Sequence, residues 1–179
     1  MTGDATDSGA RSGARPGARP WIAGDLVIDR AVLDQIHAHA RECYPSESCG
    51  FLTGPASAAL VIDAAAREDN EADKFHKLDP ETFPRTSRTY FKINELRAAR
   101  AFDRGEQEAR PIKAIYHSHC DAGAYFSQED SATFASAGEL MWPCAFVVVS
   151  VTAAGVADTK LWVHVPGTDG FRESTLTVR

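Results

Sequence analysis

The segment over residues 112–119 most constrains the fold, because it is apolar at nearly every position as far as Tyr116. A strand with one solvent-facing side alternates apolar and polar residues, whereas a nearly continuous apolar run is typical of a central strand covered on both faces. Residues 145–151 form a second run of this kind. We therefore expect a layered domain built around a sheet that is buried on both sides.

Shorter patterns around these two strands alternate between helix and strand. Helices are predicted over residues 29–43, 94–105 and 127–138, each opened by a capping residue, namely Asp29, Asn94 and Ser127. Further strands are predicted over residues 26–28, 48–54, 59–65, 90–93, 161–165 and 174–178. Residues 67–88 are charged and proline-containing, which indicates a long surface loop. The fold class is therefore α/β or α+β, with helices flanking a central mixed sheet.

The length of 179 residues suits one domain with a tail. Residues 1–20 contain no large apolar side chain except Met1, so they cannot bury enough surface to offset their ordering entropy. We expect a disordered tail over residues 1–20 and a single folded domain over residues 21–179.

Composition and charge exclude several function classes. The net charge of -6 disfavours a protein that holds nucleic acid through its phosphates. No stretch approaches the length of an apolar membrane span. The four cysteines are too sparse for a disulfide scaffold and a secretory signal is missing, so we expect reduced thiols and a cytoplasmic protein. Nothing in the sequence indicates an oligomeric state.

His117, Ser118 and His119 end the central strand and are followed, after seven residues, by Ser127-Gln128-Glu129-Asp130. Side chains two apart on a strand point to the same face, so both imidazoles can bind one ion. The connection is long enough to reverse direction and bring the next helix alongside. Asp130 in its first turn would complete a two-histidine, one-carboxylate ligand set and leave one position of a tetrahedral zinc ion open, as in catalytic zinc sites.

Each part of this pattern also has a structural interpretation. Ser127 and Asp130 have the spacing of a capping box, and a lone histidine at a strand end is more often packed or solvated than a ligand. A shuffled chain would show the whole pattern about one time in a thousand, so we favour the metal site. His37-Ala38-His39 serves as a control: it lies within a predicted helix, where such positions diverge, and is assigned no metal role. His76 and His164 are interpreted as structural.

Glu47 is the candidate general base. It lies in the segment PSESCGFLTG, at the entry to an otherwise apolar strand, where a charge is unusual unless it has a partner. An exposed glutamate at a strand start is the alternative. Together with the residues from His117 to Asp130, this segment resembles the JAMM, or MPN-plus, zinc metallopeptidase family, whose pattern is an upstream glutamate followed by H-[ST]-H-x7-S-x-x-D. The form E-x-C-G-x-L-x-G is common in its compact prokaryotic members, and the resemblance covers roughly residues 22–165.

The resemblance implies a cytidine-deaminase-like MPN domain that hydrolyses a peptide or isopeptide bond. His117, His119 and Asp130 would hold one zinc ion per chain. Glu47 would accept a proton from the attacking water and later pass it to the leaving amine, and Ser127 would hydrogen-bond the oxyanion.

The chain departs from the family at two positions, because Cys120 and Phe126 stand where many members have proline. Neither position is a ligand, so the departures affect the shape of the loop between His119 and Ser127. Cys120 could bind metal, respond to oxidation or pack, and we favour packing.

The short link over residues 138–144 bears on the substrate. Members that act on eukaryotic ubiquitin chains usually carry an insertion there. The compact form resembles prokaryotic members that process ubiquitin-like or sulfur-carrier proteins, by trimming residues beyond a Gly-Gly terminus or by cutting an isopeptide bond to it. Such a tail would lie extended in a groove, and Phe75, Leu78 and Phe83 of loop 67–88 are candidates for its wall.

Other functions are compatible with this fold. A non-catalytic MPN-type scaffold or binding module would typically have a broken ligand set, which is complete here. A nucleoside or nucleic-acid deaminase needs H-x-E and P-C-x-x-C, and Pro143-Cys144 lacks the second cysteine. A zinc amidohydrolase of small molecules would use the same site and stays an alternative.

Overall fold

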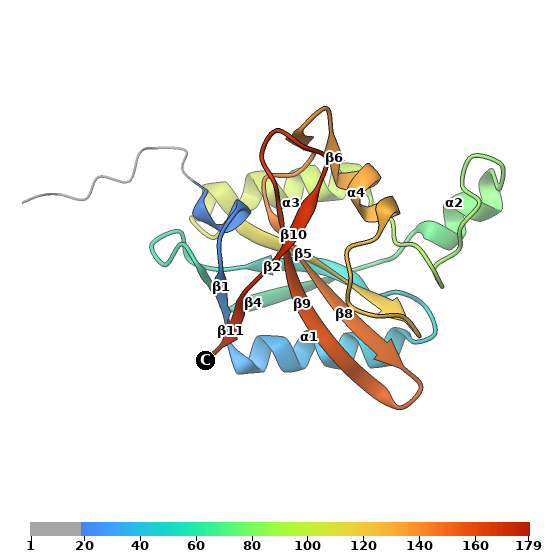
Figure 1. The fold of residues 1–179 in the computed structure, drawn as a ribbon, viewed down its shortest axis with the longest axis horizontal. Coiled ribbons are helices and arrows are strands. Elements are labelled where there is room, and N and C mark those ends of the chain that lie inside the picture. The colour runs from blue at the N-terminus through green and yellow to red at the C-terminus, as the bar shows by residue number, and fades with distance from the viewer. Residues whose placement is uncertain (1–18) are drawn as a thin grey trace, which may run out of the picture.

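The computed structural model describes residues 19–179 (Figure 1). The expected disordered tail falls almost entirely on residues 1–18, which lie outside this range. Pro20, the last residue of the expected tail, begins a short 3-10 helix, Pro20–Ile22.

A six-stranded mixed sheet forms the centre of the domain, in the order β10-β9-β8-β5-β2-β4. Its strands are β2 (Cys49–Thr53), β4 (Ala64–Glu68), β5 (Ile112–Cys120), β8 (Ala145–Thr152), β9 (Gly155–His164) and β10 (Phe171–Ser174). Strands β5 and β8 run parallel, and the other neighbours run antiparallel. Strand β5 is buried from Ile112 to His119, so the predicted central strand of a mixed sheet is confirmed.

Helices cover both faces of this sheet (Figure 1). Helix α1 (Arg30–Cys43) packs on the face to which Tyr116 of β5 points. Helix α3 (Glu95–Gln107) packs on the opposite face, where Ile115 of β5 lies in the core. The layered fold class predicted from the sequence is therefore confirmed. In the described part of the chain, no helix has the length and apolar character needed to cross a membrane.

Two short helices and two small sheets complete the described chain. The helices are α2 (Ala72–Leu78) and α4 (Gln128–Phe134). A parallel three-stranded sheet joins β1 (Leu26–Ile28) to β3 (Val61–Ile62) and to β11 (Leu176–Val178). Strands β6 (Ala135–Ser136) and β7 (Glu139–Leu140) form a hairpin after α4.

Three predicted elements need correction. The strand predicted over residues 90–93 is wrong: the backbone amide of Lys92 donates to the side chain of Asn70, so this segment is held by a side chain and not by a strand ladder. Residues 67–88, expected as a loop, contain the end of β4 and all of α2. The third predicted helix ends at Phe134 and not near Gly138, because Ala137 and Gly138 both have positive φ and form the tight turn between β6 and β7.

Other predicted boundaries shift in the structure. The predicted strands over residues 59–65 and 174–178 each divide between two sheets, as β3 and β4 and as β10 and β11. The last long strand, β9, begins six residues before the predicted start at residue 161. Asn94 caps α3 as predicted, by accepting from the amide of Arg97. Asp29 precedes α1, but its carboxylate accepts from Arg179 and makes no hydrogen bond to the helix amides.

Gly50 explains how β2 fits between β4 and β5. A Cβ atom at this position would lie 2.6 Å from Cε1 of Tyr116, closer than real side-chain contacts allow. Glycine therefore lets the backbone of β2 pass beside the Tyr116 ring. This close packing fixes β2, and with it the segment that precedes it, against β5.

Candidate active site

Strand β5 presents two histidines on the face of the sheet that carries α3. His117 and His119 follow Ile115 at intervals of two, so the three side chains share a face. Their Nε2 atoms lie 3.2 Å apart. The other ring nitrogen of His119, Nδ1, lies 2.9 Å from the carbonyl oxygen of Gly123. Since a carbonyl only accepts, Nδ1 carries the proton, and Nε2 of the neutral ring has a free lone pair.

Asp130 comes to the same place from the first turn of α4. Its Oδ1 lies 3.4 Å from Nε2 of His117, and its Oδ2 lies 3.5 Å from Nε2 of His119. The carboxylate is buried. The capping box is also present, because the Asp130 amide donates to the Ser127 hydroxyl and the Ser127 amide donates to the Asp130 carboxylate. The structural and the metal-binding interpretations therefore use the same geometry, in which the cap aims Asp130 at the two histidines.

The three residues fit a divalent metal ion. Their candidate ligand atoms all lie within 4.8 Å of one another. Nitrogen or oxygen ligands bound tetrahedrally to one zinc ion stand about 3.3 Å apart, close to the distances found here. Two imidazole lone pairs that face each other beside a carboxylate repel one another unless a cation or proton lies between them. The donor set therefore suits zinc, with His117, His119 and Asp130 as the residues that would hold it.

Burial sets the protonation of this cluster. His117 is fully buried and its ring stacks on Phe91, with ring centroids 4.3 Å apart. Burial lowers the pKa of His117, which favours the neutral ring that a metal ligand needs. Burial opposes ionisation of Asp130, but the His117 ring and hydrogen bonds from both histidines and Ser127 hold the pKa of its carboxyl well below its usual range. Within residues 19–179, Nδ1 of His117 has no hydrogen-bond partner.

Glu47 lies next to this cluster because of strand register. Cys49 pairs with His117 across β2 and β5, so an antiparallel continuation by two residues sets Glu47 opposite His119. The backbone of Glu47 is held on both sides, since its amide donates to Ser87 and its carbonyl accepts from Asn70. Its side chain is buried, not exposed as the alternative interpretation would require.

The pKa of Glu47 predicts how the metal-free protein responds to pH. Burial raises this pKa from 4.5 to about 8, so between these values the folded chain holds a proton that the unfolded chain releases. The unfolding free energy should therefore fall as pH rises through this window, by at most about 1.4 kcal/mol per pH unit. Glu47→Gln removes the titration, so its unfolding free energy should fall less.

Urea unfolding of both proteins with a chelator, from about pH 5 to about pH 9, measures this difference. We expect the unfolding free energy of the variant, minus that of the wild type, to rise by a few kcal/mol between low and high pH. Parallel pH profiles would show that Glu47 titrates normally in the folded chain.

A cavity of about 170 Å³ opens onto this arrangement. Glu47, His119 and Ser127 line it, whereas His117 and Asp130 lie in the buried layer behind. The Ser127 hydroxyl donates to Oδ2 of Asp130 over 2.6 Å, so it would have to turn from Asp130 to reach a substrate oxygen. The structure thus brings all five residues singled out in the sequence to one site.

Sequence reasoning missed several residues of this cavity. Arg85, Arg88, Tyr125 and Glu129 also line it. Tyr125 is 52% exposed and its ring lies edge-on to His119. Arg85 forms an ion pair with Glu129, N to O 2.5 Å. For the two arginines, the only available signal was the charge of loop 67–88, which does not distinguish a cavity wall from a solvated surface.

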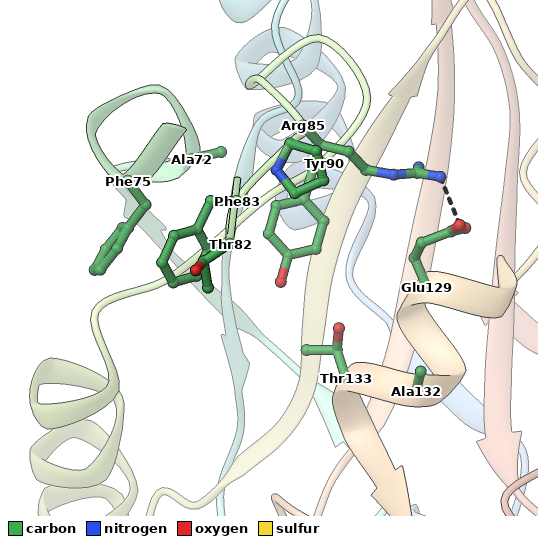
Figure 2. Close-up of a pocket in the computed structure, with 10 residues that line it drawn as sticks. Ala72, Phe75, Thr82, Phe83, Arg85, Tyr90, Glu129, Ala132 and Thr133 are labelled. Carbon is green, nitrogen blue, oxygen red and sulfur yellow. Dashed lines mark hydrogen bonds and ion pairs between the residues drawn. The ribbon is translucent and has the colours of Figure 1, made fainter. Parts of the chain in front are cut away.

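An apolar cavity of about 340 Å³ adjoins the first one. The two share Arg85 and Glu129, and Figure 2 shows this ion pair at one end, with Phe75, Phe83 and Tyr90 along the wall. Two of the three predicted groove residues, Phe75 and Phe83, therefore line a cavity. Leu78 is 73% exposed and lies outside this lining.

The remaining histidines and Cys120 have separate surroundings. His37 contacts Thr159, whereas His39 is buried and contacts the Tyr116 hydroxyl, so this second H-x-H pair diverges as expected. The rings of His76 and His164 each bond to a backbone carbonyl. Cys120 packs against the core under α1, in line with the favoured interpretation, and also lines the cavity of Glu47.

A comparison with family models identifies the chain. The model of prokaryotic homologues of the JAB domain matches residues 29–164, which include Glu47 and the whole histidine and aspartate cluster. The chain belongs to this prokaryotic JAB family. The resemblance to compact prokaryotic JAMM proteins is therefore confirmed.

Known proteins similar to this JAB-family chain include curated relatives and solved structures. Two proteins named CysO-cysteine peptidase, from Mycobacterium tuberculosis and Mycobacterium bovis, are 30% identical over 108 residues, 59% of this chain. The match spans 62% of the length of those relatives. A solution structure from Desulfitobacterium hafniense has a TM-score of 0.63 at 17% identity, covering 86% of this chain and 92% of its own. A JAB1/MPN domain protein from Archaeoglobus fulgidus has a TM-score of 0.50 at 15% identity, covering 87% and 98%.

Proposed function

We propose that this protein is a zinc-dependent peptidase that hydrolyses a bond at the C-terminal Gly-Gly of a ubiquitin-like or sulfur-carrier protein. The observation that carries the proposal is the convergence of His117, His119 and Asp130 beside the buried carboxyl of Glu47. Family membership and the peptidase names of the mycobacterial relatives support it. We propose residues 21–179 as the catalytic domain.

His117, His119 and Asp130 would hold the ion through two imidazole nitrogens and a carboxylate oxygen. A bound zinc ion supplies a Lewis acid that makes water nucleophilic at neutral pH. His119 is oriented by its hydrogen bond to Gly123, and Asp130 by the cap at the start of α4. Such second contacts hold ligands in place before metal and substrate arrive.

Glu47 would move the proton. As the water oxygen bonds to the carbonyl carbon, Glu47 takes a proton from it and then delivers that proton to the nitrogen, while the C–N bond breaks. Burial raises the pKa of Glu47 in the metal-free chain, and the ionised carboxylate of a group with a raised pKa is a stronger base than an ordinary one. Ser127 would turn its hydroxyl from Asp130 toward the oxyanion and donate to it there.

The adjoining apolar cavity supports a protein tail as substrate. Glycines carry no side chains, so a Gly-Gly terminus would pass Arg85 and Glu129, which line both cavities, with little steric hindrance and reach Glu47. The residues before Gly-Gly would then lie against Phe75 and Phe83. The cysteines described as free thiols fit the reducing cytoplasm in which we propose that the protein acts.

Mass spectrometry tests this function. The zinc-loaded protein is incubated with small carrier proteins that end in Gly-Gly plus one or two residues. The carrier mass should fall by the mass of the residues beyond Gly-Gly, and a chelator should stop the reaction until zinc is restored. Intact carriers with the zinc-loaded protein would contradict the proposal, and chelator-sensitive cleavage of acylated amino acids alone would favour the small-molecule amidohydrolase.

A further inference from the structure

Three consecutive carbonyl groups in the loop that follows β5, those of residues 122–124, are each held by a side chain from a different strand. The Ser150 hydroxyl on β8 donates to the first carbonyl over 2.6 Å. Nδ1 of His119 on β5 donates to the second over 2.9 Å, and the Trp162 indole on β9 donates to the third over 2.9 Å. The loop is therefore tied to three neighbouring strands of the central sheet.

Backbone contacts contribute little to the shape of this loop. Asp121, where the chain leaves β8, has a φ of 56°, and its amide makes the last backbone bond to Val151. Across the described residues, the amides of residues 122–126 donate to no backbone carbonyl. Phe126 stands where many family members have proline, so the restriction that a proline ring places on φ is missing as well. The side chains that reach in from the sheet must therefore hold the loop.

The middle carbonyl of the three, that of Gly123, orients a candidate metal ligand. Gly123 is exposed, so water can compete with Nδ1 of His119 for this carbonyl whenever the loop moves. The two flanking bonds are better shielded, because Ser150 and Ala124 are both buried. Anchors on either side thus limit how far the Gly123 carbonyl can move from the His119 ring.

We propose that Ser150 and Trp162 are positioning residues that hold His119 in its metal-binding orientation through the loop over residues 122–124. With the middle carbonyl fixed, Nδ1 keeps its proton and Nε2 keeps the lone pair that a metal ion would bind. Neither Ser150 nor Trp162 lines the cavity of about 170 Å³, so both act through the loop and not on a substrate. The inference rests on the proposed metal site and adds two residues to its support.

Zinc affinity of two conservative variants tests this role. Trp162→Phe removes the indole donor but keeps an aromatic ring beside Phe126, and Ser150→Ala removes only a hydroxyl group. Residues that support a metal ligand typically change metal affinity by 10- to 100-fold, so each variant should bind zinc at least about tenfold more weakly than wild type. Competition with a chelator of known zinc affinity measures the change.

Trp21→Phe is the matched control for the loss of an indole donor. The Trp21 indole donates to the carbonyl of Pro143, which is not part of the loop. Urea unfolding with a chelator should show a similar loss of stability in Trp21→Phe and Trp162→Phe, because each loses one hydrogen bond. Only Trp162→Phe should lose zinc affinity, which separates a positioning role from a general structural one.

Nitrogen NMR of the metal-free protein adds a readout that does not depend on zinc. At about pH 9, where imidazole rings are neutral, His119 of the wild type should be protonated at Nδ1 alone. Its signals are those that disappear in His119→Ala. In Trp162→Phe and Ser150→Ala they should shift toward an average of the two tautomers.

Unchanged zinc affinity together with an unchanged His119 tautomer in both variants would overturn the inference, even if both proteins were less stable. A wild-type protein that binds no zinc would instead overturn the proposed function. The tautomer of His119 in the metal-free variants would then still decide whether Ser150 and Trp162 position this ring.

Discussion

Replacing Glu47 by glutamine is expected to lower kcat for carrier cleavage by a factor of about 10² to 10⁴ while one zinc ion stays bound per chain. Glutamine keeps the size and polarity of the side chain but cannot accept a proton from water. The backbone contacts of Glu47 with Ser87 and Asn70 do not involve its carboxyl, so they should survive the substitution. Turnover by mass spectrometry and metal content by elemental analysis, on the same sample, measure the two effects.

Glu95→Gln is the control for the loss of a carboxylate elsewhere. Glu95 lies in the first turn of α3, largely exposed and paired with Lys92. The Glu95→Gln variant should keep both its bound zinc and its turnover of the carrier. A Glu47→Gln protein with unchanged kcat would exclude Glu47 as the base, and one that has lost its zinc would make Glu47 a ligand or a structural support of the metal site.

The metal cluster could be found from sequence because its geometry is local. His117 and His119 share a face by the two-residue period of a strand, and the cap formed by Ser127 fixes the direction of Asp130. One connection brings these two elements together. The periodicity of the sequence therefore predicts both the central strand of the sheet and the candidate ligands at its end.

Glu47 lay beyond local reasoning, and the family pattern was needed to pair it with the cluster. Its place opposite His119 depends on the register between β2 and β5, which lie about 65 residues apart in sequence, as Cys49 and His117 illustrate. That register depends in turn on packing such as Tyr116 over Gly50. A two-residue period specifies which side chains share a face but not which strand lies alongside.

The wall of the cavity could not be predicted because side chains hold it in place. Asp73 accepts from both the amide and the hydroxyl of Ser87, and Asn70 bonds to Glu47, Tyr90 and Lys92. Such contacts have no period in the sequence. For this reason the segment containing Arg88 could be described in advance only as charged, and the extended segment around Lys92 was mistaken for a strand.

His119→Ala is expected to lose the zinc ion and, with it, carrier cleavage. The substitution removes one of three protein ligands and the hydrogen bond to Gly123 that orients the ring. It is a better test than His117→Ala, because His117 is fully buried against Phe91 and its loss would also leave a hole in the core. Metal content per chain and the change in unfolding temperature on adding zinc measure the effect.

The second H-x-H pair supplies the control for this variant. His37 is half-buried on α1 and contacts Thr159, so His37→Ala removes a comparable imidazole far from Asp130. Zinc at about 100 times its dissociation constant should stabilise wild type and His37→Ala by about 2.7 kcal/mol, and His119→Ala hardly at all. If His119→Ala bound one zinc ion as tightly as wild type, the ion would lie elsewhere. Asp130 would then keep only its role in the capping box of α4.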